Sequence, residues 1–273
     1  MKKCVLSVLL LVSWPLSACG GGGGDSPGGS CSVLKVTNGD NCDNSASPVA
    51  LIIAETRRGK LSICTGTVIA PTAILTAAHC VLNPSDPLVD VVVGVPAGAG
   101  AVSNRSITSV RYDSRYTVLP GGAAVYDQAV IRLAFDAGAV PVPLLGSDRI
   151  APGDTITVFG YGQDEQGRDL FTRVEQGDYD QMLKAGDMIV GALNPARLVF
   201  EASFDSTNQS ACFGDSGGPA ILKRNGVAVI AGVVSYGSVG TCQQGSYAAL
   251  GNVGNANNLS WIRSQVPEAQ IIN

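Results

Sequence analysis

Short apolar runs, rich in β-branched residues and separated by Gly, Pro, Asn and Asp, fill the chain from about Val36 onward. The runs are VALII, GTVIA, AILTA, VDVVVGV, QAVIRL, TITVFG, MIVGAL and AVIAGVVSYG. This pattern predicts many short β-strands rather than alternating strands and helices. Helical periodicity occurs mainly in NNLSWIRSQV, where Leu259, Ile262 and Val266 fall on one face. Asn258 can cap this helix. We therefore expect an all-β fold of two packed antiparallel barrels with a C-terminal helix.

Composition excludes several classes of protein. The 273 residues include 34 Gly and 14 Pro, which is neither a disordered nor a fibrous composition. The formal net charge is -4, and Lys and Arg form no cluster. A nucleic-acid-binding face needs such a cluster, so we expect no nucleic-acid partner. We expect the protein to be a monomer.

The N-terminus, MKKCVLSVLLLVSWPLSACG, has the pattern of an export signal. Lys2 and Lys3 precede an apolar stretch, residues 5–12, that is too short to span a bilayer. The end of the signal, LSAC, resembles the lipobox of bacterial lipoproteins, in which Cys19 would be diacylated. Small residues here also suit ordinary signal cleavage. The lipobox implies an outer-membrane anchor in a bacterial cell envelope, and ordinary cleavage implies a periplasmic or secreted protein.

The residues that follow contain nothing that could build a core. Residues 20–30, GGGGGDSPGGS, are typical of a flexible tether. We therefore divide the chain into a signal peptide (1–18), a Gly-rich tether and propeptide (19–35) and a folded domain (36–273).

Export implies an oxidising compartment in which cysteines pair. Of the eight cysteines, Cys4 leaves with the signal and Cys19 carries lipid, so six remain. Six cysteines allow fifteen connectivities, and sequence does not decide among them. Proximity in the sequence favours the pairs Cys31–Cys42, Cys64–Cys80 and Cys212–Cys242.

Ser216 lies in the glycine-rich stretch CFGDSGGPA. The spacing fits the nucleophile elbow of an α/β-hydrolase, and it equally fits a tight turn with no catalytic role. The single histidine of the chain, His79 in ILTAAHC, helps to decide. Any near-neutral imidazole base must be His79. A buried core histidine is the alternative. A zinc site with Cys64 and Cys80 lacks the usual ligand spacing, so we expect no metal.

The order of residues separates the folds that use Ser, His and Asp. No histidine follows Ser216, which excludes the α/β-hydrolase order. The subtilisin order would use Asp40 or Asp43 and needs a helix after the serine, but strand-like runs follow Ser216. The order His, Asp, Ser remains. Asp127 in VYDQAVIRL opens a predicted strand, where a buried carboxylate needs a partner such as an imidazole N–H. A strand-start Asp in a turn is the alternative.

These residues resemble the trypsin-like (chymotrypsin-fold) serine proteases. The resemblance rests on LTAAHC, YDQAVIRL, GDSGGP and VVSYG, with the weaker VFGYG and SWIRSQV, and covers the chain from about Val36 to its end. It implies two six-stranded barrels with the active site in the cleft between them, no cofactor, and protein or peptide substrates. Ser216 would attack the carbonyl carbon, His79 would transfer the proton, and Asp127 would hold the imidazole.

The resemblance also implies supporting roles. The N–H groups of Gly214 and Ser216 would bind the oxyanion. Ser235 would support Asp127. Asp215 would bind a new N-terminus at Val36, freed by cleavage after Lys35, although Val-Thr-Asn-Gly replaces the commoner Ile-Val-Gly-Gly.

The pocket that the resemblance implies has Ser210 at its base and Gly237 and Gly245 as walls, beside Ser235 and Tyr236. No carboxylate lies at the base, so we expect a preference for a large apolar side chain before the scissile bond. A surface-tethered binding protein or adhesin without catalysis, and more weakly a non-proteolytic esterase, are alternative functions.

Overall fold

The structure is a computed structural model that describes residues 47–98, 101–147, 150–163, 183–203, 211–237 and 247–273. All of these residues lie in one compact unit, Cys31–Asn273. Strands predominate, and the helices of the described ranges are α1 (Ala78–Val81) and α3 (Ala256–Gln265). Neither helix is long and apolar enough to span a bilayer. The eight apolar runs identified in the sequence lie in β1, β2, β3, β4, β9, β11, β12 and β15, which confirms the predicted strands.

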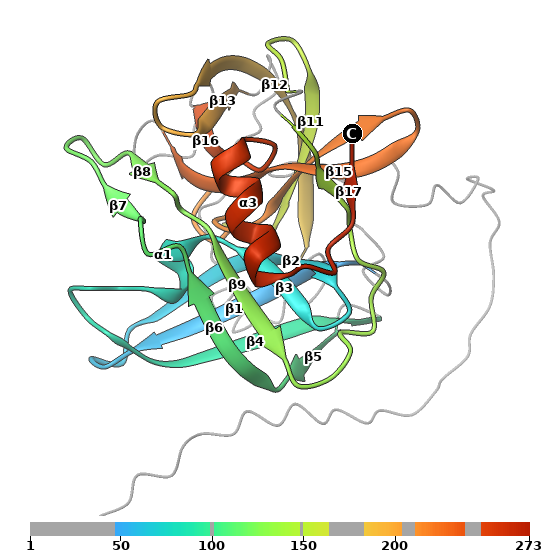
Figure 1. Ribbon diagram of the computed structural model, residues 1–273. Helices are drawn as coiled ribbons and strands as arrows, with labels where there is room; N and C mark the ends of the chain where they lie inside the picture. The colour runs from blue at the N-terminus through green and yellow to red at the C-terminus, as the bar shows by residue number, and fades with distance from the viewer. Residues whose placement is uncertain (1–46, 99–100, 148–149, 164–182, 204–210, 238–246) are drawn as a thin grey trace, which may run out of the picture. The chain divides into compact units, whose positions relative to one another are not determined.

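The first sheet has seven strands in the order β5-β4-β1-β2-β3-β9-β6 (Figure 1). Its members are β1 (Val49–Thr56), β2 (Leu61–Ala70), β3 (Ala73–Thr76), β4 (Leu88–Gly98), β5 (Ala101–Arg105), β6 (Ile107–Tyr112) and β9 (Ala129–Leu133). The edge strands β5 and β6 are separated in the chain by Ser106 alone. The chain therefore runs from one edge of the sheet to the other through Ser106. If β5 and β6 are counted as one bent strand, the sheet has the six strands that were predicted.

The second sheet closes by hydrogen bonding. Its order is β14-β11-β12-β13-β16-β15-β10-β17, and an additional β14–β15 pairing joins six of these strands into a barrel. The barrel strands are β11 (Thr155–Gly160), β12 (Lys184–Asn194), β13 (Val199–Ser203), β14 (Pro219–Arg224), β15 (Val227–Gly237) and β16 (Tyr247–Asn252). Two short strands, β10 (Leu144–Leu145) and β17 (Ile271–Ile272), add to its edge by parallel pairing. A separate pair consists of β7 (Thr117–Val118) and β8 (Ala124–Val125).

Each sheet packs against its own cluster of buried apolar side chains. Ile52, Ile74 and Ile131 belong to the core of the first sheet, and Ile156, Met188 and Phe200 belong to that of the second. In β11 the buried and less buried residues alternate, as expected for a strand with one face in the core. The two-barrel all-β fold with a C-terminal helix is therefore confirmed.

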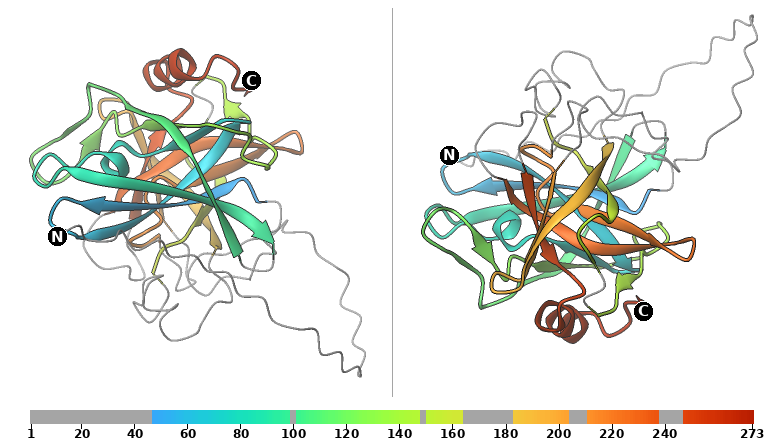
Figure 2. Two further views of the ribbon diagram at one scale, coloured as in Figure 1. Left: turned by 90° about the horizontal axis from the view of Figure 1, so that it is seen from below. Right: turned by 90° about the horizontal axis from the view of Figure 1, so that it is seen from above.

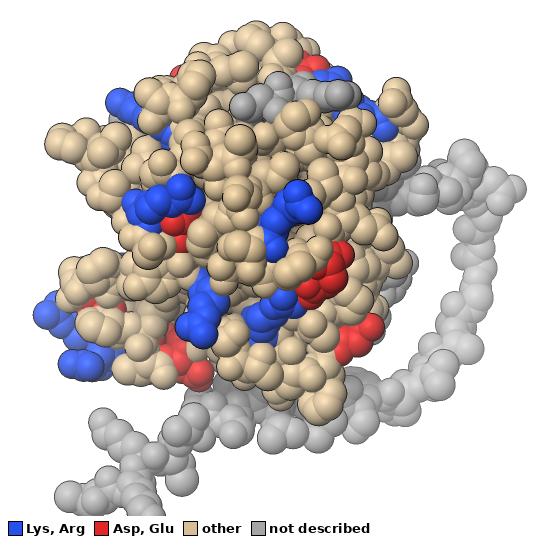
Figure 3. Space-filling model, viewed as in Figure 1, with Lys and Arg blue, Asp and Glu red and all other residues tan. Residues whose placement is uncertain are grey.

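Helix α3 lies on the outside, against one side of the two sheets (Figure 2). Ile262 of α3 and Val266 join the core of the first sheet although they follow the second in the chain. The helix thereby ties the two sheets together. On the face of the molecule that carries α3, charged side chains are scattered over a mainly uncharged surface (Figure 3).

The predicted cap of this helix is wrong. Asn255, not Asn258, is the N-cap, and its side chain accepts a hydrogen bond from the Asn257 N–H. Asn258 lies within the first turn, buried, where its amide donates to the carbonyls of Leu198 and Asn252. Several asparagines compete for the cap, and the tertiary contacts of Asn258 decide between them.

Candidate active site

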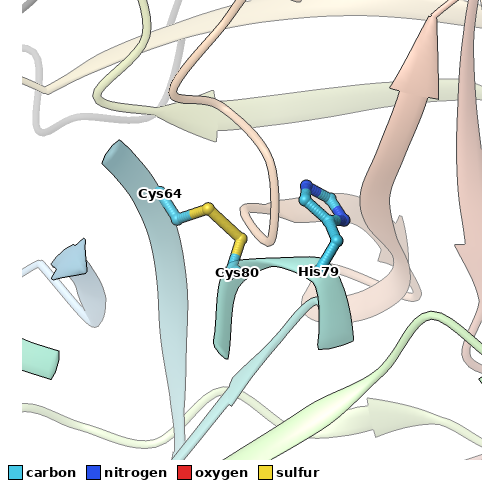
Figure 4. A group of neighbouring side chains, drawn as sticks. All are labelled: Cys64, His79 and Cys80. Carbon is cyan, nitrogen blue, oxygen red and sulfur yellow. A yellow bond between two sulfur atoms is a disulfide. The ribbon is translucent and has the colours of Figure 1, made fainter. Parts of the chain in front are cut away.

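His79 lies on α1, a single helical turn that follows β3. The next residue, Cys80, forms a disulfide with Cys64 of β2, with 6.0 Å between the two Cα atoms (Figure 4). The structure thus contains the predicted Cys64–Cys80 pair. A loop of this size contributes about 3 kcal/mol in the chain-entropy model. The bridge fixes the turn that presents the imidazole.

Asp127 lies between β8 and β9, and its carboxylate faces His79. The Asp127 Oδ2 atom is 2.8 Å from His79 Nδ1, and Oδ1 accepts the His79 backbone N–H at 3.0 Å. The Ser235 hydroxyl donates to Oδ2 at 2.5 Å. The side chain of Asp127 is 2% exposed and that of His79 is 30% exposed. A buried carboxylate thus holds one edge of the imidazole ring while the ring remains accessible.

A β-bulge aims Ser235 at this carboxylate. The register between β15 and β16 shifts between Val234 and Tyr236, so Ser235 has no partner of its own in that ladder. Bulges commonly redirect a side chain beside an active site. The shift explains how a residue of the second sheet contacts the carboxylate that precedes β9.

The two groups shift each other's pKa in opposite directions. Burial opposes the charged imidazole, but the charge of Asp127 and its hydrogen bond outweigh burial, so the pKa of His79 is raised above 6.5. Burial likewise opposes the Asp127 carboxylate, but His79 and Ser235 outweigh it, so the pKa of Asp127 is lowered below 3.8. The carboxylate is therefore ionised at neutral pH, and the imidazole is a stronger base than a free one.

A second buried carboxylate, Asp113, holds the segment that carries Asp127. Its backbone N–H donates to the Gln128 carbonyl at 3.0 Å, and its Oδ2 accepts the Gln128 side-chain amide at 3.1 Å. Arg115 binds both carboxylate oxygens of Asp113 and lies over the Tyr126 ring, 4.1 Å from its centroid. Tyr126 has a φ of 55°, a strained value for a non-glycine residue. This network fixes the backbone on both sides of Asp127.

Ser216 lies in the turn before β14, between two glycines with positive φ: Gly214 (103°) and Gly217 (82°). Residues other than glycine rarely adopt these backbone conformations, so the turn requires glycine at both positions. Within the described residues, neither the Gly214 N–H nor the Ser216 N–H donates a hydrogen bond. Gly214 is buried, and a buried N–H without an acceptor is uncommon. Two free donors therefore flank the candidate nucleophile.

The backbone of Ser216 lies beside the turn that carries His79. Its carbonyl oxygen accepts the Thr65 N–H at 2.8 Å and is 3.5 Å from the Cys80 Sγ. A Cβ built on Gly217 would be 3.0 Å from the Ala77 nitrogen. No hydrogen bond joins the Ser216 hydroxyl to His79 in the described residues, and such bonds often tighten only when substrate binds.

Asp215 is fully buried, with its carboxylate turned away from the solvent. Its two oxygens accept the N–H groups of Gly162 and Cys212, each at 2.8 Å. A Cβ built on Gly160 or Gly162 would lie 2.0 to 2.5 Å from this carboxylate. VFGYG therefore requires its two glycines so that the backbone can enclose Asp215.

A metal site is the remaining interpretation of His79 to be tested. The ligand atoms of Cys64, His79 and Cys80 lie within 4.8 Å of one another. The two sulfurs are bonded to each other, so they offer no thiolates to a metal.

The structure describes some of the other predicted residues. Cys212 is disulfide-bonded, but its predicted partner lies outside the described residues. Tyr236 is partly buried, and Gly237 is exposed near the Tyr247 carbonyl. The remaining predicted residues, Cys19, Cys31, Lys35, Val36, Cys42, Ser210, Cys242 and Gly245, also lie outside the described residues.

Sequence reasoning missed the buried residues that hydrogen-bond the segments carrying Ser216 and Asp127, among them Thr65, Asp113 and Gln128. Each is a buried polar residue. Gln128 was the one visible signal, because a glutamine directly before the apolar run AVI must find a partner when it is buried.

One closed barrel and one half-barrel sheet, with an imidazole–carboxylate pair beside a glycine-bounded serine, define a two-barrel serine hydrolase. The trypsin family model matches residues 36–262, so the chain belongs to the trypsin family, and its enzyme class is serine-type endopeptidase. Its substrates are accordingly proteins or peptides.

Two relatives are serine protease SP24D of Anopheles gambiae and spermosin of Halocynthia roretzi. The chain is 28% identical to the first over 217 residues, covering 76% of this chain and 73% of that protein. It is 28% identical to the second over 239 residues, covering 77% of this chain and 56% of that protein.

Proposed function

We propose that Ser216, His79 and Asp127 form the catalytic triad of this endopeptidase. The observation that carries the proposal is the buried Asp127 carboxylate, which binds both the Nδ1 atom and the backbone N–H of His79. That geometry fixes the tautomer in which Nε2 can accept a proton.

Each reaction step then has a group to perform it. Ser216 Oγ attacks the peptide carbonyl carbon while its proton passes to His79 Nε2, and the carbonyl oxygen becomes an oxyanion. His79 returns the proton to the leaving amine as the C–N bond breaks, which leaves an acyl ester on Ser216. Water attacks this ester with His79 again as the base, and Ser216 regains its proton. Asp127 stabilises the charged imidazole throughout.

The oxyanion is bound by the N–H groups of Gly214 and Ser216. These two donors have no acceptor within the described residues, and one donor of this kind contributes roughly 3 kcal/mol to the transition state.

A fluorophosphonate probe tests the triad. Wild type should be labelled, Ser216→Ala and His79→Ala should not, and Ser264→Ala, which removes an exposed serine of α3, should be labelled like wild type. Absence of labelling in correctly processed wild type would favour the tethered binding protein instead.

We further propose that cleavage after Lys35 activates the enzyme, with the freed amine of Val36 binding Asp215. Support comes from the burial of Asp215, because a buried carboxylate favours a cationic partner. N-terminal sequencing of active enzyme should begin at Val36. A fully active form that begins at Cys19 would contradict the proposal. If Cys31 pairs with Cys42, the cleaved enzyme stays attached to its leader.

For specificity we propose a large apolar residue before the scissile bond, accepted by a pocket of Ser210, Gly237 and Gly245 beside Ser235 and Tyr236. The support is the absence of any carboxylate at the proposed base. A peptide-library profile should show Phe, Tyr, Leu or Met, and a preference for Lys or Arg would refute it.

For localisation we propose export through residues 1–18 and lipid attachment at Cys19, with residues 19–35 as the tether to the bacterial outer membrane. The Cys64–Cys80 disulfide supports an oxidising compartment. Wild type should enter the detergent phase in a phase partition and Cys19→Ala the aqueous phase. Aqueous partition of both would contradict the anchor.

A further inference from the structure

Thr65 of β2 contacts the Ser216 turn through both its side chain and its backbone. The sequence alone did not indicate these contacts. Thr65 is fully buried and follows Cys64 in the chain. Its hydroxyl donates to the Gly214 carbonyl at 2.8 Å and accepts the Tyr161 N–H at 3.1 Å. Its backbone N–H donates to the Ser216 carbonyl at 2.8 Å. One residue of the first sheet therefore binds three peptide groups that belong to the second.

We propose that Thr65 is a positioning residue that holds the peptide between the two oxyanion donors and so keeps both donors in place. This inference rests on the proposed triad and its oxyanion site, and assigns a role in that site to a residue of the opposite sheet.

The carbonyl groups of residues 213–216 each accept a hydrogen bond. The donors to carbonyls 213, 214, 215 and 216 are, in order, Gln163 N–H at 2.9 Å, Thr65 Oγ1 at 2.8 Å, Gly218 N–H at 2.9 Å and Thr65 N–H at 2.8 Å. The peptide group is planar and trans, so an anchored carbonyl fixes the opposite direction of the N–H on the next residue. The bond from Gln163 to carbonyl 213 thus directs the Gly214 N–H, and the bond from Gly218 to carbonyl 215 directs the Ser216 N–H. Carbonyl 214, which Thr65 Oγ1 holds, belongs to the peptide between these two and links their orientations.

Thr65 supplies the other two anchors, on the peptide between the two donor-bearing peptides and on the peptide that follows them, and its hydroxyl is the only side chain among the four donors. The bond from the Thr65 hydroxyl matters most at the Gly214 carbonyl, because a glycine restricts its own backbone less than any other residue. Without the hydroxyl, the Gly214 carbonyl loses its hydrogen bond, while the Asp215 N–H of the same peptide still donates to the Cys212 carbonyl at 3.0 Å.

The surroundings of Thr65 restrict which side chain can take its place. Its Cγ2 methyl would be 3.1 Å from a Cβ on Gly218, so a larger side chain has no room. Its carbonyl accepts the Thr76 hydroxyl at 2.7 Å, which fixes the residue from the β3 side. Valine has the same shape but can neither donate to Gly214 nor accept from Tyr161.

Three isosteric or near-isosteric variants test the proposal: Thr65→Val, Thr65→Ser and the control Thr67→Val. Thr67 is buried in the same strand, and its hydroxyl makes no hydrogen bond to the described residues. We expect Thr65→Val to lower kcat by about 10- to 100-fold, somewhat less than the loss of a whole oxyanion donor. Its KM should stay within about twofold, because the Thr65 hydroxyl acts on the transition state. Thr65→Ser and Thr67→Val should stay near wild type.

Two further measurements distinguish an effect on the position of the oxyanion donors from an effect on general stability. Thr65→Val should lose affinity for a peptide boronate or aldehyde, whose tetrahedral adduct places an oxygen in the oxyanion site, by the same factor as kcat. The acid limb of its pH profile should be unchanged, since His79 and Asp127 are untouched. Equal kcat in Thr65→Val and Thr67→Val, or a loss that lies only in KM, would overturn the proposal.

If Thr65→Val does not fold, Thr65→Ala removes the same hydroxyl from a smaller side chain and should show the same pattern. If neither folds while Thr65→Ser is fully active, the hydroxyl serves the stability of the domain and the proposal is wrong. Inactive wild type with no fluorophosphonate labelling would instead refute the triad itself.

Discussion

At the scale of single residues, the coupling between His79 and Asp127 can be measured directly. The chain has one histidine, so its imidazole signal can be followed by NMR without assignment, provided that no His tag is present. The pKa in the folded protein should lie above 6.5, because Asp127 outweighs burial. Asp127→Asn removes the charge and leaves the burial, so its His79 pKa should fall below 6.5.

The sign of the linkage follows from the same shift. A raised folded-state pKa means that His79 adds stability at pH values below its unfolded pKa of 6.5, and this contribution is lost as the pH rises through the folded pKa. Catalysis has the opposite dependence, since the base must be neutral. A wild-type titration midpoint at or below 6.5 would contradict the coupling.

Gly162 offers a second test at this scale. A methyl group at this position would lie 2.5 Å from the Asp215 carboxylate. We expect Gly162→Ala to destabilise the protein by about 1–3 kcal/mol in denaturant unfolding and to lower activity, because Asp215 must move. In the control Gly191→Ala the nearest atom would be 3.9 Å away. An equally small effect of both changes would show that Asp215 is not tightly enclosed.

At the scale of elements, the Cys64–Cys80 bridge joins β2 to the short helix that carries His79. Replacing both cysteines by Ala should lower the free energy of unfolding by about 3 kcal/mol. Activity should also fall, since α1 has only four residues and little stability of its own. Denaturant unfolding and peptide hydrolysis measure the two effects. Full activity at an unchanged unfolding midpoint would contradict the role of the bridge.

The N-cap of α3 gives a prediction on which sequence and structure disagree. Asn255→Ala should cost about 1 kcal/mol of stability, because it removes the acceptor for the Asn257 N–H. Asn257→Ala removes an exposed side chain and serves as the control. Thermal unfolding compares the two, and equal midpoints would argue against the observed cap.

Eight of the strands were predictable from the sequence, because β-branched runs between turn residues leave few alternatives. The helix was predictable as an element but not at its start, since capping depends on which asparagine the tertiary contacts take. His79 and Asp127 could be chosen from residue order and burial. Thr65 could not, because nothing in CTGTVIA indicates that a threonine of the first sheet faces a glycine carbonyl 149 residues away.

At the scale of the whole molecule, each sheet supplies part of the site. The first carries His79, Asp127 and Thr65, and the second carries the Ser216 turn and Ser235. The proposed chemistry therefore requires the two sheets to keep their relative positions, and Ile262 of α3, packed in the first core, helps to hold them. Trypsin-family membership explains the architecture, and the network of buried Asp113 and Gln128 with exposed Arg115 shows how this chain fixes its own carboxylate.

The central claim is that Ser216 carries the acyl group during turnover. Mass spectrometry of enzyme quenched while it hydrolyses a slow ester substrate tests this most directly. We expect one added acyl mass, located on the peptide that contains Ser216, and none in Ser216→Ala or in His79→Ala. Turnover by Ser216→Ala at the wild-type rate, or an adduct on another residue, would contradict it.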